Sequence, residues 1–341
     1  MPALAVAEAL RARGAEVEFV GGERAEAQLV PAAGYPFHPI QVTGIDRGSL
    51  LRAARAVVLA VFALPKALAV LRRVQPDVVI GGGGYVAGPV GLAAALLRIP
   101  LILTEADSHL GMANRLLAPA AKRVFLSFPI GGRGGRKYVV SGRALPQGTG
   151  KADRAAARAR FGIAEDAQCL LVFGGSLGAR TLNRAAIDAF GAAAPCVVLH
   201  ASGRRDYDEL RAKLDQLGSP PHYLLHPYIE PFADALAAAD LTAARAGGSV
   251  LELAAAGLPA VLVPYPYASA DHQTSNARWM EREGAAVVVP DAELDGPRLA
   301  REVAALLGSP ARLRTMAAAA QRVARPDAAE TIAHAALELA D

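Results

Sequence analysis

Twice in this 341-residue chain, a short apolar run ends in a cluster of glycines and continues into a helical pattern. The first run, Val78–Ile80, leads into Gly81–Gly84, and the second, Leu170–Phe173, leads into Gly174–Gly178. Consecutive glycines carry a large cost in backbone entropy, so these turns indicate that the backbone faces a ligand. Amide N–H groups at the start of a helix attract phosphate. The pattern predicts one anion-binding turn per domain and a ligand site in the cleft between the two domains.

The alternation of strand and helix patterns along the chain predicts an α/β protein with two doubly wound parallel sheets. Hydrophobic residues make up 53% of the sequence, which suits helices packed on buried strands. A glycine-rich stretch, Gly131–Gly150, separates a first domain at 1–146 from a second at 151–341. The last helical pattern, Ala328–Leu339, is a candidate for packing back on the first domain.

The expected strands are short apolar runs. They are Val17–Val20, Val78–Ile80, Leu101–Leu103, Val124–Leu126 and Val139–Val140 in the first domain, and Cys169–Phe173, Val197–His200, Tyr223–Leu225, Leu241–Ala243, Ala260–Val263 and Ala286–Val289 in the second. The expected helices include Leu50–Arg73, Pro89–Leu97, Met112–Ala118, Asp153–Phe161, Leu299–Leu307 and Leu313–Ala324.

Charge and cysteine content narrow the classes of partner. A surplus of 36 Lys and Arg over 32 Asp and Glu gives a net charge of +4, which is too small to indicate nucleic-acid binding. This charge is compatible with an anionic membrane surface or a phosphorylated ligand. Cys169 and Cys196 lie in apolar runs, so we expect buried free thiols and a reducing, cytoplasmic setting.

The most hydrophobic segment is Ala53–Val70, which Pro65 and Lys66 interrupt. It lacks the roughly 18 uninterrupted apolar residues that a membrane span needs, so we expect it not to cross a bilayer. Two interpretations remain open. The segment is a core helix, or its apolar surface and flanking arginines form an interfacial membrane patch.

Two further turns carry polar residues that suit a sugar nucleotide. In Ala244–Glu252, a strand ends at small residues and a helix begins. The carboxylate of Glu252 either favours the N-terminal half of that helix or accepts hydrogen bonds from two vicinal ribose hydroxyls. In the polar loop Pro264–Asn276, four side chains are either N-cap and turn residues or hydrogen-bond donors for a sugar: Asp271, His272, Gln273 and Asn276. The Asp206-Tyr-Asp208 motif could suggest a metal site, but its charged surroundings favour a solvated helix start. We therefore expect no metal and no other cofactor.

Several of these motifs, in this order, resemble the MurG family. The resemblance rests on Gly174–Asn183, His200–Gly203, Arg245–Pro259 and Asp271–Ala277 in the second domain, and on Pro76–Pro89 and Thr104–Asn114 in the first. It implies the GT-B fold, with two Rossmann-like domains and a cleft between them. It also implies inverting transfer of N-acetylglucosamine (GlcNAc) from UDP-GlcNAc to the C4 hydroxyl of MurNAc in undecaprenyl-pyrophosphoryl-MurNAc-pentapeptide (lipid I). The product is lipid II for peptidoglycan, so the resemblance links the chain to cell wall biogenesis, cell shape and cell division.

The resemblance also implies site residues. For the donor, Ser176 with Gly175 and Gly178 would contact the diphosphate, Ile229 the uracil, Glu252 the ribose, and Gln273 and Thr274 the GlcNAc, while Arg143, Asn183 and Arg245 match further donor positions. For the acceptor, the implied residues are Gly83, Gly84, Tyr85 and Asn114. The implied membrane patch contains Val58, Val61 and Leu64. The enzyme would then be peripheral, on the cytoplasmic face of the cell membrane, with other cell-wall synthesis or division proteins as further partners.

The chain departs from the family pattern at its beginning. Family members open with a strand and a glycine loop that carries a His, whereas this sequence opens with the helical pattern Pro2–Gly14. We therefore expect that the natural protein is longer and that the sequence as given lacks that strand, loop and His. The candidates for the general base are then Glu105, Asp107 and His109, with His272 as a fourth.

Two other functions stay open at this point. The chain could be another GT-B enzyme that uses a UDP-sugar, such as an epimerase or a different glycosyltransferase. It could also be an inactive homologue that binds the nucleotide sugar as a scaffold.

Overall fold

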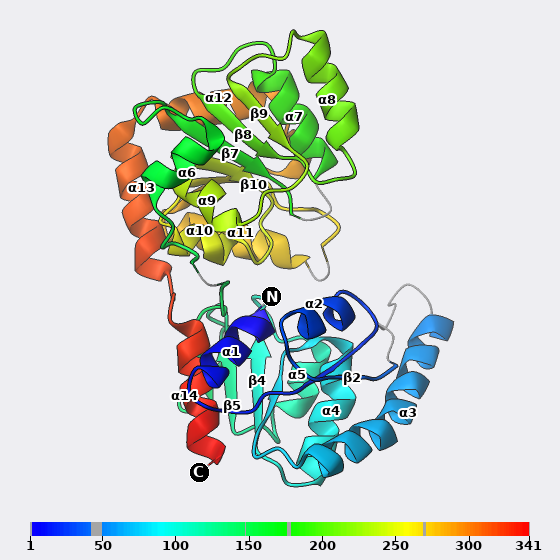
Figure 1. Ribbon diagram of the computed structural model, residues 1–341. Coiled ribbons are helices and arrows are strands. Elements are labelled where there is room, and N and C mark those ends of the chain that lie inside the picture. The colour runs from blue at the N-terminus through cyan, green and yellow to red at the C-terminus, as the bar shows by residue number, and fades with distance from the viewer. Residues whose placement is uncertain (1, 42–49, 147, 176–178, 269–270, 341) are drawn as a thin grey trace. The chain divides into compact units, whose positions relative to one another are not determined.

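The computed structural model describes residues 2–41, 50–146, 148–175, 179–268 and 271–340, with the backbone alone described for 50–61. The chain divides into two compact units, which Figure 1 shows coloured along the sequence. Unit 1 comprises residues 1–146 and 326–341, and unit 2 comprises residues 147–325.

Unit 1 alternates short strands with helices. Its elements are α1 (Pro2–Arg11), β1 (Phe19–Gly21), α2 (Glu26–Ala32), β2 (Phe37–Pro39), α3 (Leu50–Val74), β3 (Val79–Gly81), α4 (Gly84–Leu96), β4 (Leu101–Glu105), α5 (Met112–Leu117), β5 (Arg123–Leu126), β6 (Tyr138–Val140) and α14 (Ala328–Ala340). The strands pair in parallel in two groups, β1 with β2, and β3-β4-β5-β6. Within the described residues, no backbone hydrogen bond joins β1 to β3.

The core of unit 1 lies on both faces of the β3–β6 sheet. Leu101, Leu103 and Val124 pack with α3 and α4 in one apolar cluster. On the other face, Ile102 and Phe125 pack with α1 and with Ile332 of α14. The last helix of the chain therefore covers the sheet of the first unit, and Figure 1 shows it beside α1.

Unit 2 is a single parallel sheet covered by helices. Its elements are α6 (Arg154–Phe161), β7 (Cys169–Phe173), α7 (Arg180–Phe190), β8 (Val197–Ala201), α8 (Tyr207–Gln216), β9 (Tyr223–His226), α9 (Phe232–Ala238), β10 (Leu241–Ala244), α10 (Val250–Ala255), β11 (Ala260–Leu262), α11 (His272–Arg282), β12 (Ala286–Val288), α12 (Gly296–Leu307) and α13 (Pro310–Val323). The strand order is β12-β11-β10-β7-β8-β9. Strands β7, β10 and β11 are completely buried, as their uninterrupted apolar sequences require.

The predicted doubly wound α/β architecture is confirmed, and the expected strands all form. Four of the described α-helices and β-strands were not predicted: α2, β2, α9 and α11. A three-residue strand that ends in Pro39 has no apolar alternation to detect. Helix α11 begins at His272, inside the segment expected to be a polar loop. Helix α4 begins at Gly84 rather than at Pro89. Cys169 and Cys196 are buried free thiols, as expected, and burial raises their pKa to about 12 and about 11. In the described part of the chain, no helix is long and apolar enough to cross a membrane.

Candidate functional site

The sheet of unit 2 has a topological switch point between β7 and β10. From β7 the chain proceeds outward through β8 and β9, and from β10 it proceeds through β11 and β12 in the other direction. In open α/β sheets, ligands bind beyond the carboxyl ends of the strands at such a point, since the two connecting turns diverge there. The turns after β7 and β10 carry the predicted donor residues.

The turn after β7 needs glycine for two different physical reasons. A Cβ on Gly174 would stand 2.2 Å from the Cβ of Ala179, so the backbone can fold back there only without a side chain. Gly175 has a φ of +98°, which side chains rarely tolerate. Helix α7 starts at Arg180, so its N-terminus faces this turn. Ser176 and Gly178 lie outside the described residues.

In the turn after β10, the side chain of Arg245 makes three polar contacts with other parts of unit 2. Its side chain is 7% exposed and donates to the carbonyl oxygens of Val263 (3.1 Å) and Pro264 (3.4 Å). It also forms an ion pair with Asp291, with an N–O distance of 2.5 Å. All three contacts are made by Nη1, so this nitrogen connects the end of β10 with the residues that follow β11.

Helix α11 approaches the same turn. Asn276 is buried and donates to the carbonyl oxygen of Ala246 (3.1 Å). Gln273 accepts a hydrogen bond from the backbone N–H of Tyr265 (2.9 Å), and its Nε2 lies 3.9 Å from the position of a Cβ on Gly247. The structure therefore brings Gln273 to the β10 turn, just before the helix that carries Glu252.

The other predicted donor residues are distributed over neighbouring turns. Ile229 is buried after β9, and Thr274 is half-buried on α11. Asn183 is completely buried on α7, where its amide bonds to other protein groups. Arg143 belongs to unit 1 and is half-buried.

In unit 1, the ends of β3 and β4 lie side by side and carry the predicted acceptor and catalytic residues. Glu105 ends β4 and is 6% exposed. Its carboxylate accepts hydrogen bonds from the backbone N–H groups of Asp107 (3.2 Å) and Gly111 (2.8 Å) and from Nδ2 of Asn114 (2.9 Å). With three donors on its carboxylate, Glu105 closes the loop between β4 and α5 instead of offering a free base.

Asn114 connects this loop to the glycine turn after β3. It is 1% exposed, and its Nδ2 also donates to the carbonyl oxygen of Thr104 (3.0 Å). A Cβ on Gly83 would lie 3.5 Å from that nitrogen. Gly83 and Gly84 have φ values of +76° and +74°, so the start of α4 depends on glycine. Tyr85 is exposed on the first turn of α4.

The loop between β4 and α5 also holds two of the other base candidates, and the fourth, His272, begins α11 in unit 2. Asp107 and His109 are half-buried, and among the described residues neither side chain has a hydrogen-bond partner. Their side chains are therefore chemically available, in contrast to that of Glu105.

Of the three residues in the predicted membrane patch, the structure describes the side chain of Leu64 alone. The side chains of Val58 and Val61 lie outside the described residues. Leu64 is half-buried and packs against the core of unit 1, and its place on a membrane surface stays a prediction. On α3 itself, Phe62 is 73% exposed. Further exposed large apolar side chains lie on the packed helices α4 and α5, and we call this second set the α4–α5 patch: Leu92, Leu96, Met112 and Leu116.

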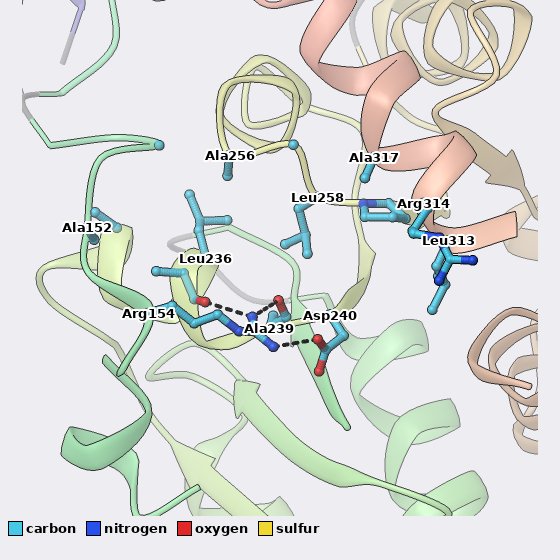
Figure 2. Close-up of a pocket in the computed structure, with 15 residues that line it drawn as sticks. Ala152, Arg154, Leu236, Ala239, Asp240, Ala256, Leu258, Leu313, Arg314 and Ala317 are labelled. Carbon is cyan, nitrogen blue, oxygen red and sulfur yellow. Dashed lines mark hydrogen bonds and ion pairs between the residues drawn. The ribbon is translucent and has the colours of Figure 1, made fainter. Parts of the chain in front are cut away.

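A cavity of about 380 Å³ lies at the opposite edge of the unit 2 sheet (Figure 2). Asp240 and Pro259, which precede β10 and β11, line it together with Leu236 and Leu313. Its wall includes Arg154, which bonds to Asp240 and to the carbonyl oxygens of Ala237 and Ala239, so these polar groups satisfy one another. None of the predicted site residues lines this cavity.

Sequence reasoning missed three charged residues at the carboxyl edge of the sheet: Arg180, Arg205 and Asp206. Asp206 was expected to be solvated, and this is wrong, since the residue is 3% exposed and bonds to Asn183 and Arg205. The signal available in the sequence was its place directly after β8, because loops at that edge of a parallel sheet converge on ligands.

Comparisons with known proteins agree with this geometry. The chain matches the glycosyltransferase family 28 N-terminal domain over residues 1–126 and the glycosyltransferase family 28 C-terminal domain over residues 169–332. Two curated relatives are named UDP-N-acetylglucosamine–N-acetylmuramyl-(pentapeptide) pyrophosphoryl-undecaprenol N-acetylglucosamine transferase. The protein of Alkalilimnicola ehrlichii is 45% identical over 348 residues, and that of Methylococcus capsulatus is 43% identical over 341 residues. Both alignments cover 99% of this chain and 94% of the relative.

Among solved structures, MurG of Acinetobacter baumannii superposes with a TM-score of 0.79 at 30% sequence identity. The superposition covers 99% of this chain and 95% of that protein.

Proposed function

The chain belongs to the MurG family of family 28 glycosyltransferases with the GT-B fold, and from this premise we propose its reaction. The enzyme transfers GlcNAc from UDP-GlcNAc to the C4 hydroxyl of MurNAc in lipid I, with inversion at C1, and forms lipid II for peptidoglycan. The observation that carries the proposal is the 45% identity, over almost the whole chain, to a relative named for this transfer. No comparable observation favours an epimerase or a scaffold.

On the donor side, unit 2 supplies the turns at the switch point. The N–H groups of the Gly174–Gly178 turn and Ser176 bind the diphosphate, and Glu252 binds the ribose hydroxyls. Ile229 contacts the uracil, and Gln273 and Thr274 bind the GlcNAc. Asn183 and Arg245 belong to the site as supports of its turns, because their polar atoms already bond to protein groups.

On the acceptor side, unit 1 supplies the glycine turn at Gly83 and Gly84, with Tyr85 and the buried Asn114 beside it. The acceptor hydroxyl must lose a proton as its oxygen attacks C1. We assign this proton to Asp107 or His109, since the carboxylate of Glu105 already accepts three hydrogen bonds from the protein. Arg143 of this unit matches a further donor position of the family.

The test combines labelled UDP-GlcNAc with a lipid I analogue and measures the labelled lipid product. Wild-type protein is expected to form it, and E252A is expected to weaken UDP-GlcNAc binding by about 1–3 kcal/mol through loss of the ribose hydrogen bonds. The exposed Glu283 provides a matched control, since E283A removes a carboxylate elsewhere in unit 2. Absence of product with the sequence as given and with an N-terminally extended form would refute the transferase proposal.

We also propose that the enzyme works as a peripheral protein on the cytoplasmic face of the membrane and contacts the bilayer through the α4–α5 patch. Leu96 and Leu116 are 60% and 73% exposed, and Arg98 and Arg115 lie on the surface next to them in the sequence. Apolar side chains beside basic ones suit the interface of an anionic membrane.

Sedimentation with anionic phospholipid vesicles tests this surface. The double variant L96D/L116D is expected to leave the vesicle fraction while it keeps its fold. The control is L217D, which changes an exposed leucine of unit 2. Equal partitioning of L96D/L116D and wild type would show that the patch does not touch the bilayer.

A further inference from the structure

Unit 2 contains a buried chain of polar side chains that leads toward the glycine turn after β7. The hydroxyl of Tyr223 on β9 bonds to Nδ1 of His200 on β8 (2.8 Å), and Nε2 of His200 bonds to Oδ1 of Asn183 on α7 (3.0 Å). Asn183 donates from Nδ2 to the carbonyl oxygen of Ser202 (2.9 Å) and to Oδ2 of Asp206 (3.1 Å). His200 and Asn183 are completely buried, so this chain of bonds is shielded from water.

The direction of each hydrogen bond in this chain is fixed. Burial lowers the pKa of His200 to about 3, so the imidazole is neutral and has a single N–H. Because Oδ1 of Asn183 can only accept, that N–H is on Nε2, and Nδ1 accepts from the hydroxyl of Tyr223. Asn183 is thereby held with its NH₂ group toward Asp206.

Asp206 is the point where the buried chain meets the surface. Its side chain is 4% exposed, and its carboxylate accepts from Nε of Arg205 at 2.9 Å and from Nη2 at 3.2 Å. Nη2 of Arg180 lies 3.6 Å from the same carboxylate. The hydrogen bond from Arg205 lowers the pKa of Asp206, which therefore stays ionised. One carboxylate between two guanidinium groups leaves a net charge of +1.

The two arginines stand at the predicted diphosphate site. Arg180 is the first residue of α7, directly after the glycine turn, and Arg205 follows β8, the neighbour of β7 in the sheet. Both side chains are 55% exposed, so they can reach a ligand. A buried carboxylate is costly unless it is paired, and an apolar residue would fill the place of Asp206 at lower cost. A charged residue at position 206 therefore indicates that the carboxylate itself has a role.

We propose that Asp206 is a positioning residue for the transfer reaction, holding Arg180 and Arg205 where they bind the diphosphate of the nucleotide. This inference rests on the proposed function. When the bond between C1 of GlcNAc and the diphosphate oxygen breaks, its electron pair stays on that oxygen. The acceptor oxygen bonds to C1 and its proton passes to the base. The two guanidinium groups offset the charge that accumulates on the departing UDP.

The test compares UDP with uridine, which lacks the diphosphate, by calorimetric titration of the full chain. R180Q and R205Q are each expected to weaken UDP binding about tenfold, the loss of one charge-assisted hydrogen bond, and to leave uridine binding unchanged. D206N is expected to lower UDP affinity and kcat while uridine affinity stays constant, because its neutral amide cannot hold both arginines. Should D206N fail to fold, R180Q and R205Q still test whether the two arginines held by Asp206 bind the diphosphate.

A matched control lies on helices α7 and α8. Arg184 and Glu209 form a half-exposed pair between α7 and α8 with an N–O distance of 3.4 Å, and R184Q and E209Q are expected to bind UDP as wild type does. A wild-type ratio of UDP to uridine affinity in R180Q/R205Q would overturn the proposal, as would a wild-type protein that does not bind UDP. If UDP binding depends on the arginines but lipid I is not glycosylated, the proposed transfer fails and the diphosphate contact stands.

Discussion

At the scale of single residues, side chains that match family positions divide into groups that face a ligand and groups that hold the backbone. Asn183 belongs to the second group, since its amide serves His200, Ser202 and Asp206 at once. N183A would leave these buried partners unpaired, so we expect it to lower the free energy of unfolding of unit 2 by about 2–4 kcal/mol. Urea denaturation measures this change. An unaltered unfolding curve combined with a large loss of donor affinity would make Asn183 a direct ligand instead.

His200 gives the stability of unit 2 a predictable dependence on pH. Burial lowers its pKa from 6.5 to about 3, so the unfolded state binds a proton that the folded state excludes in this range. The contribution of the neutral His200 imidazole to the free energy of unfolding is complete above pH 6.5. It decreases by about 1.4 kcal/mol per pH unit as the pH falls toward 3. Between pH 7 and pH 5, wild type is expected to lose about 2 kcal/mol more than H200Q.

The measurement is urea denaturation of both proteins at several pH values. Burial also lowers the pKa of His226, which adds to the pH dependence of both proteins equally. Only the difference between them therefore reports on His200. Parallel curves for wild type and H200Q would contradict a neutral, buried imidazole.

At this scale, the sequence could predict the features that depend on local backbone conformation. The glycine turns at Gly83 and Gly174 were found because their conformation and close packing leave no alternative residue. The burial of Asp206 and the three hydrogen bonds to the Glu105 carboxylate could not be predicted from the sequence, because both depend on groups that other parts of the chain supply.

At the scale of elements, the junction between α6 and β7 depends on one buried arginine. Arg158 is 2% exposed, and it donates to four carbonyl oxygens, those of Ala164, Glu165, Ala167 and Ala238, and to the carboxylate of Asp240. This set of bonds ties the helix, the loop before β7 and the end of α9 together. We expect R158A to cost about 3–5 kcal/mol of stability, because it leaves four carbonyl oxygens without this donor and removes one of the partners of the Asp240 carboxylate.

Helix α6 provides its own control for this prediction. Arg160 of α6 pairs with Asp234 of α9, and its side chain is 40% exposed, so R160A is expected to cost less than about 1 kcal/mol. The free energies of unfolding of the two variants decide the comparison. Similar losses in both would show that burial of Arg158 adds nothing.

Helix α3 shows features of both interpretations that its apolar run left open. Ala67 and Leu71 pack inward with Leu64, which suits a core helix, whereas Phe62 is exposed, which suits an interfacial surface. The exposed leucines of α4 are seven to eleven residues after Tyr85 on one helical face, in a segment that the sequence marked only as a ligand loop and a helix.

At the scale of the whole molecule, the last helix of the chain, α14, forms part of the core of unit 1. Helix α14 packs on α1, with Ile332 and Ala336 buried against Val6 and Ala9. Arg123 forms an ion pair with Glu338, and Arg13 forms one with Glu330. Removal of residues 326–341 would expose this apolar face of unit 1 and leave the core of unit 2 intact.

We therefore expect the truncated chain to lose stability in unit 1 alone. Thermal unfolding with and without UDP separates the two units, because a ligand at 100 times its Kd stabilises the unit that binds it by about 2.7 kcal/mol. The UDP-sensitive transition should keep its midpoint in the truncated chain, and the UDP-insensitive transition should fall. E330Q is the matched control, since it breaks a half-exposed surface pair and keeps the helix in place. A fall in the UDP-sensitive transition would mean that α14 supports the donor unit as well, which its packing within unit 1 does not provide for.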